Sequence, residues 1–154
     1  MAEFTHLKED RVQMVDISGK GEVVREAVAV GRIHLREETL RAIRDGSILK
    51  GNVLATARIA GILAVKETPR TIPLCHPIPL TGIDVDFSDG EGFILATVTV
   101  RSRGQTGVEM EALTGVSVAL LTIWDMVKSA EKDAAGQYPA TRIDGIRVLA
   151  KRKG

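Results

Sequence analysis

An acid and an amine stand three residues apart in the long apolar stretch 107–132, at Asp125 and Lys128. At this spacing two side chains share one face of a helix. An exposed pair of this kind is usually a surface ion pair of small effect. A pair that is partly withdrawn from water can instead transfer protons near neutral pH. The surface ion pair is the commoner case, whereas the apolar neighbours Trp124 and Met126 of Asp125 suggest a partly buried setting, so both interpretations stay open.

Two further acids, Glu109 and Glu111, bracket Met110 near the start of the same stretch. Negative charge at a helix start complements the helix dipole. Residues two positions apart point to opposite sides of a helix, so the dipole explains one acid better than both. We therefore expect one of the two carboxylates to face a specific partner.

The length of this helix separates the two groups of acids. Glu111 and Asp125 are fourteen positions apart, which is about 21 Å along a helix axis. One small ligand can hardly touch both on one helix. If both act, the site combines residues from two subunits, which predicts a homo-oligomer with composite sites.

A second polar cluster is the I-P-L-C-H-P segment, which holds Cys75 and His76 between Pro73 and Pro77. Neighbouring side chains diverge in an extended segment, which argues against a nucleophilic Cys–His pair. A Cys–His hydrolase is therefore the third reading, and Cys75 is expected to be a buried small hydrophobe. His76 fits a ligand-binding group and equally a structural histidine bonded to backbone.

Most lysines and arginines of a chain are solvated surface, but Lys50 is harder to dismiss. It stands at an expected helix start, where a cation opposes the dipole, so we expect it to serve a ligand or a tertiary partner. The histidines lack metal-ligand spacing and no zinc motif is present, so no metal site is predicted. No dinucleotide or Walker pattern is present either.

The composition excludes several classes of protein. The 154 residues suit one domain, 1–154. A net charge of +1 and 3% aromatic residues argue against nucleic-acid binding. The lone Cys75 fits a reducing compartment. No N-terminal apolar run resembles a signal peptide, and no segment is expected to reach membrane-spanning length, so we expect a cytoplasmic protein.

The periodicity predicts the elements that position these residues. Residues 1–21 lack a clear period and are expected to form a mobile or ligand-ordered arm. Alternation predicts strands, and a 3.6-residue period predicts helices. The expected strands are 23–33, 82–87, 92–101 and 143–149, and the expected helices are 37–44, 50–67 and 107–132. This order predicts an α+β, ferredoxin-like fold, with an antiparallel sheet of about four strands packed against two long helices.

Five segments of the chain resemble the MoaC family, the cyclic pyranopterin monophosphate synthases of molybdenum cofactor biosynthesis. They are M-V-D-I from Met14, K-G-N-V-L-A-T-A-R-I-A-G-I from Lys50, I-P-L-C-H-P from Ile72, T-G-V-E-M-E-A-L-T from Thr106 and L-T-I-W-D-M-V-K from Leu121. The resemblance implies a lyase that converts 3′,8-cyclo-7,8-dihydroguanosine 5′-triphosphate, a GTP-derived pterin precursor, to cyclic pyranopterin monophosphate and pyrophosphate. It implies a hexamer, a trimer of dimers, with sites at subunit interfaces. The alternative is a non-catalytic small-molecule-binding regulatory module on the same scaffold.

The resemblance also assigns roles position by position. It places the catalytic acid on Asp125 and the essential lysine on Lys128. The substrate-binding groups that it implies are Leu74, Cys75, His76, Glu109, Met110, Glu111, Lys50, Arg25 and Lys151. No cofactor is implied, and the sequence does not decide whether Mg²⁺ is required.

The chain departs from the family pattern at three places. Asn52 stands where an Asp is common, which argues against a carboxylate function there. The segment 134–143 is longer than the commonest pattern, which weakens the alignment of Lys151. The glycine-rich tail of many members is reduced to K-R-K-G.

Overall fold

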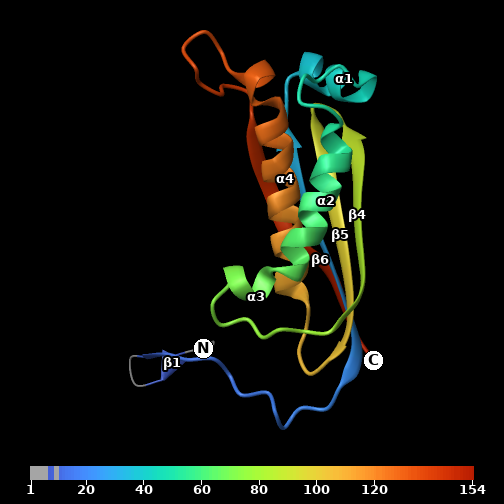
Figure 1. Ribbon diagram of the computed structural model, residues 1–154, viewed down its shortest axis with the longest axis vertical. Coiled ribbons are helices and arrows are strands. Elements are labelled where there is room, and N and C mark those ends of the chain that lie inside the picture. The colour runs from blue at the N-terminus through green and yellow to red at the C-terminus, as the bar shows by residue number, and fades with distance from the viewer. Residues whose placement is uncertain (1–6, 9–10) are drawn as a thin grey trace.

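The computed structural model describes residues 7–8 and 11–154. Two helices lie side by side across one face of a four-stranded sheet (Figure 1). The elements in chain order are β1 Leu7–Lys8, β2 Arg11–Val12, β3 Val23–His34, α1 Glu37–Asp45, α2 Val53–Lys66, α3 Thr68–Thr71, β4 Leu80–Gly90, β5 Phe93–Gly104, α4 Glu109–Glu131 and β6 Arg142–Lys153. The four-stranded sheet and the two long helices α2 and α4 confirm the predicted α+β class.

The sheet has the strand order β4-β5-β3-β6, and every neighbouring pair is antiparallel. Each helical connection therefore skips one strand: β5 lies between β3 and β4, and β3 lies between β5 and β6. This split β-α-β arrangement, repeated twice, is the ferredoxin-like pattern. β1 and β2 form a separate two-stranded sheet.

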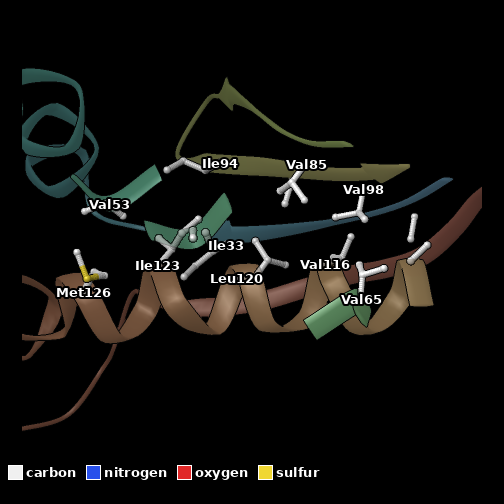
Figure 2. Close-up of a cluster of buried hydrophobic side chains, with 14 of the residues drawn as sticks. Ile33, Val53, Val65, Val85, Ile94, Val98, Val116, Leu120, Ile123 and Met126 are labelled. Carbon is white, nitrogen blue, oxygen red and sulfur yellow. The ribbon is translucent and has the colours of Figure 1, made fainter. Parts of the chain in front are cut away.

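The core lies between the sheet and the two long helices (Figure 2). Alternate residues of the central strands point into it, and α4 meets them with a stripe of aliphatic side chains. Buried members of the core include Ala27, Ala29, Ile33, Val98, Val116, Leu120 and Ile123. Aliphatic residues dominate because the chain has so few aromatic ones.

Glycines let α2 approach α4 closely. A Cβ atom added at Gly61 would come within 3.3 Å of the Gly115 carbonyl oxygen, and one added at Gly115 would lie 2.6 Å from Val65. Side chains at these two positions would push the helices apart. The close packing expected of a glycine inside a helix is therefore present.

Most helices and strands begin and end within a few residues of the positions that the periodicity predicted. The differences have physical causes. α2 begins at Val53 rather than residue 50, because the Asn52 side chain accepts a hydrogen bond from the Ala55 N–H and caps the helix. The β4–β5 hairpin is longer than expected and turns at Gly92, whose φ is +81°. β6 continues to Lys153, so the basic C-terminal residues form part of a strand that is paired with β3.

α4 corrects the expectation that nothing reaches membrane-spanning length. Its 23 residues, Glu109–Glu131, are long and apolar enough for that by length and composition alone. Half of the apolar window is buried inside the protein, where the helix packs against the sheet. The helix is apolar because it is a core element, and its length alone is weak evidence for a membrane.

Candidate functional site

The candidate residues form two groups at opposite ends of α4. At its N-terminal end, where α3 and residues 13–22 lie (Figure 1), there is a cavity of about 560 Å³. Its walls come from the N-terminal segment, the proline-rich segment and the start of α4. They include Val15, Ile17, Lys20, Leu74, Cys75, His76, Glu109 and Met110. The structure thus brings together five of the residues predicted to bind substrate.

The proline-rich segment places Cys75 and His76 beside α4. α3 ends at Thr71, and the Cys75 N–H donates to the Ile72 carbonyl oxygen at 3.1 Å. Pro73 and Pro77 fix the backbone φ on either side of the pair. This local stiffness holds both side chains at the cavity wall without regular secondary structure.

Cys75 is half-buried and donates a hydrogen bond, which differs from the buried small hydrophobe that the sequence suggested. Its Sγ lies 3.6 Å from Oε2 of Glu111. Burial, and secondly the Glu111 carboxylate, raise the pKa of Cys75 to about 11. The thiolate is the nucleophilic form of cysteine, so this environment opposes the Cys–His hydrolase.

Glu111 itself lies behind Cys75, with 2% of its surface exposed. Its Oε1 has no hydrogen-bond partner among the described residues. Burial raises the pKa of Glu111, and the hydrogen bond from Cys75 opposes this shift. Glu111 is therefore the acid that faces a specific partner, as the spacing predicted.

Cations surround this end of the helix. Lys151 Nζ lies 3.2 Å from Glu109 Oε1. Arg25 donates to the carbonyl oxygens of Gly104 and Gln105 at 3.3 and 3.4 Å. A second cavity of about 370 Å³ is lined by Lys20, Gly21, Val23, Arg25, Thr106 and Lys153. Anionic groups such as phosphates suit such a lining.

The other end of α4 carries the acid–amine pair. Asp125 Oδ1 lies 2.8 Å from Lys128 Nζ, and Asp125 Oδ2 lies 3.2 Å from Lys50 Nζ. Lys50 Nζ also donates to the Asp125 carbonyl oxygen at 3.2 Å. Lys50 thus has the tertiary partner that its place before α2 suggested.

The pair is not in the partly buried setting that its apolar neighbours suggested. Asp125 and Lys128 are 57% and 44% exposed, because they lie on the side of α4 that faces away from the sheet. Hydrogen bonds from Lys128 and then Lys50 lower the pKa of Asp125, and the bond to Asp125 raises the pKa of Lys128. Both shifts stabilise the charged forms, so in the single chain this is a surface ion cluster.

Sequence reasoning expected residues 1–21 to form a mobile or ligand-ordered arm but named none of them as a site residue. Lys20 lines both cavities. Asp16 accepts from the Ser18 N–H at 2.8 Å, and this bond lowers the pKa of Asp16, with a smaller contribution from His76. The M-V-D-I block was the available signal, since it includes Asp16. Residues 1–6 and 9–10 of the expected arm lie outside the described residues.

The fold and these groups define an α+β chain with the elements of a site for an anionic small molecule. The model of the MoaC family matches residues 14–154. A protein of Methanoregula boonei is 70% identical over 154 residues, which cover 100% of this chain and 99% of that one. A protein of Methanosphaerula palustris is 69% identical over the full length of both chains. A protein of Pyrococcus abyssi is 65% identical over 97% of this chain and 94% of its own. Each is named a probable cyclic pyranopterin monophosphate synthase, and the chain belongs to the MoaC family.

Proposed function

We propose that this protein is a cyclic pyranopterin monophosphate synthase. It converts 3′,8-cyclo-7,8-dihydroguanosine 5′-triphosphate to cyclic pyranopterin monophosphate and releases pyrophosphate, a step of molybdenum cofactor biosynthesis. The observation that carries the proposal is the match of residues 14–154 to the MoaC family, together with full-length similarity to relatives named for this activity.

The chemistry needs proton transfer and stabilisation of phosphate charge. The cyclic phosphate forms when a ribose oxygen attacks phosphorus and the bond to the departing pyrophosphate breaks. Cations near the leaving group stabilise its charge, and Arg25, Lys20 and Lys151 stand at the cavity end of α4. Rearrangement of the ring system needs proton donors and acceptors. Asp125 and Lys128 supply them.

We further propose that the active site is composite. The acid–amine pair lines neither of the two cavities, and about 21 Å of helix separates Asp125 from Glu111. A neighbouring subunit that brings its cavity end to this pair would complete the site. Burial would also move the pKa values of the pair back towards neutrality, because desolvation disfavours both charged forms.

Exposed apolar side chains on the outer surface of the helices support this assembly. Ile59 and Leu63 of α2 and Leu121 of α4 are all more than half exposed. A helix that is apolar on several sides is usually covered. We propose that copies of this chain cover it in a homo-oligomer, a hexamer arranged as a trimer of dimers.

The activity is tested by incubating the purified protein with the cyclic GTP-derived substrate and measuring released pyrophosphate. We expect one pyrophosphate and one cyclic pyranopterin monophosphate for each substrate molecule consumed. If folded protein binds the substrate without turnover, the regulatory module replaces the synthase. That module is less favoured, because the acid–amine pair and His76 are both retained.

The composite site has its own test, which uses two inactive variants. His76→Ala removes a group of the cavity end, and Asp125→Ala removes the acid. In an equal mixture after subunit exchange, about half of the dimers are mixed, and one site in each has both native groups. We expect recovery of roughly a quarter of native activity. No recovery after verified exchange would contradict the composite site.

The cellular location belongs to the same proposal. A biosynthetic enzyme with a single free cysteine fits the reducing cytoplasm. Fractionation of cells that express the protein at native levels tests this, and membrane-bound activity would contradict it.

A further inference from the structure

The segment between α4 and β6 is the part of the chain that the family resemblance explains least. It projects beyond the C-terminal end of α4 (Figure 1). One buried carboxylate anchors both of its ends. Glu131, which is fully buried, accepts hydrogen bonds from the Arg36 N–H at 3.2 Å, from the Thr39 hydroxyl, and from the Thr141 hydroxyl at 2.7 Å. The segment therefore starts and ends at a fixed point of the fold.

Within the segment, Asp133 closes a tight turn. Its Oδ1 accepts from the N–H groups of Ala135 and Gln137 at 2.9 Å, and its own N–H donates to the Gln137 carbonyl oxygen at 2.9 Å. Gly136 completes the turn with a φ of +77°, which glycine adopts without strain. The next residue, Tyr138, is thus presented by an internally bonded turn.

Tyr138 lies against the residue that precedes the catalytic acid. Its ring meets the Trp124 ring edge to face, with centroids 5.2 Å apart and an interplanar angle of 62°. Tyr138 is also close enough to Lys128 to act on it electrostatically, as the smallest contribution to the raised pKa of that lysine. The tyrosine therefore stands beside the acid–amine pair.

The phenol hydroxyl of Tyr138 is available to a ligand. The side chain is half-buried, so its hydroxyl can be reached from the solvent side while its ring packs on Trp124. Within residues 7–8 and 11–154, the contact of the Tyr138 side chain is that of its ring with Trp124, and its hydroxyl has no hydrogen-bond partner there. The ammonium groups of Lys128 and of Lys50, which both contact Asp125, attract anionic oxygen atoms, to which a phenol can donate.

We propose that Tyr138 contacts the substrate, its hydroxyl donating a hydrogen bond to an oxygen of the phosphorylated ribose held at the Asp125–Lys128 pair. This inference rests on the proposed function and adds one binding residue to it. Trp124 holds the ring of Tyr138 in place, and the turn at Asp133 holds its backbone.

Tyr138→Phe is the decisive variant, because it keeps the ring contact with Trp124 and removes only the hydroxyl. We expect kcat/KM for the cyclic GTP-derived substrate to fall roughly tenfold, as for a lost bond to a charged group. The loss should lie mainly in KM, because the bond is made in the ground state as well. Tyr138→Ala should lose more. Gln137→Ala, a change to the adjacent exposed side chain, should leave both constants unchanged.

A binding measurement separates this inference from the proposed reaction. Trp124 is the only tryptophan of the chain, so intrinsic fluorescence reports directly on this site. Titration with the same substrate should give a Kd roughly tenfold higher for Tyr138→Phe than for the native protein. If no pyrophosphate forms in any sample, the proposed synthase activity is refuted. The titration still decides whether Tyr138 contacts the substrate. Constants for Tyr138→Phe within twofold of native values would overturn the inference.

Discussion

The two ends of α4 carry different parts of the candidate site. The N-terminal end has a cavity, a buried carboxylate and a thiol hydrogen-bonded to it. The C-terminal end has an acid and two amines in an exposed ion cluster that lines neither cavity. One end can enclose a ligand, and the other holds groups suited to proton transfer.

The pKa shifts at the two ends run in opposite directions for the same kind of group. Burial raises the pKa of Glu111, whereas hydrogen bonds from two lysines lower the pKa of Asp125. Desolvation dominates where solvent is excluded, and paired charge dominates where it is not. The two carboxylates on one helix therefore favour different protonation states. Glu111 favours the neutral form and Asp125 favours the charged form.

The largest expected effect comes from breaking the exposed end. Asp125→Ala and Lys128→Ala should each lower turnover by roughly 10²–10⁴-fold, the usual range for a lost proton-transfer group. Folding should persist, because both side chains lie more than 40% exposed. Pyrophosphate release and near-ultraviolet circular dichroism measure the two quantities. Near-native rates in either variant would refute the assigned roles.

Lys50→Ala should have an intermediate effect. It removes one of the two cations on Asp125 and leaves Lys128 in place. We expect turnover to fall roughly tenfold to a hundredfold, while the free energy of unfolding changes by less than about 1 kcal/mol, as for exposed ion pairs. Urea titration provides the second value. If the loss of stability is large enough to account for the loss of activity, the role of Lys50 is structural and not functional.

Changes at Cys75 should be milder for activity and informative about the cavity end. Cys75→Ala should cost only a few-fold in turnover, because the thiol supports Glu111 and is no nucleophile. The chain has one cysteine, so reaction with a disulfide reagent reports on it alone. The rate should keep rising with pH towards the thiol pKa of about 11. Complete loss of activity in Cys75→Ala would instead favour the Cys–His hydrolase interpretation.

The smallest effect is on stability and concerns Glu111. Its folded pKa lies above the ordinary 4.5, so its protonated form favours folding. That stability is lost as pH rises from the unfolded to the folded pKa. Glu111→Gln removes this titration and should be more stable than the native protein at neutral pH by about 1–3 kcal/mol. The difference should shrink below pH 4.5.

Glu109→Gln is the matched control for this comparison, since Glu109 is partly exposed and paired with Lys151. Urea unfolding of the three proteins at acidic and neutral pH measures the trend. A difference between Glu111→Gln and native protein that does not depend on pH would contradict the raised pKa.

Much of the fold could be predicted because its local signals agree with its packing. Alternation in 23–33 and the long apolar period in 107–132 placed β3 and α4 within a few residues. The extension of β6 to Lys153 could not be predicted, because a K-R-K run has no strand signal of its own. Pairing with the β3 residues Arg25 and Glu26 makes it a strand.

The candidate site was predicted in its members but only partly in its environment. Spacing predicted that one of Glu109 and Glu111 faces a specific partner, and the structure gives Lys151 to Glu109 and Cys75 to Glu111. Flanking apolar residues suggested a partly buried Asp125, whereas in the single chain its side chain is 57% exposed. On a helix, immediate sequence neighbours occupy other faces and do not report on the exposure of a residue.

The amino-acid sequence alone determined the order of strands and helices, the family and the separation of the two acidic groups along one helix. These follow from periodicity, from motif identity and from the constant rise of an α-helix. Only the tertiary structure decided which carboxylate is buried, which lysines meet Asp125 and where Tyr138 lies. Those outcomes depend on segments far apart in the chain, and their contacts arise only when the layers pack together.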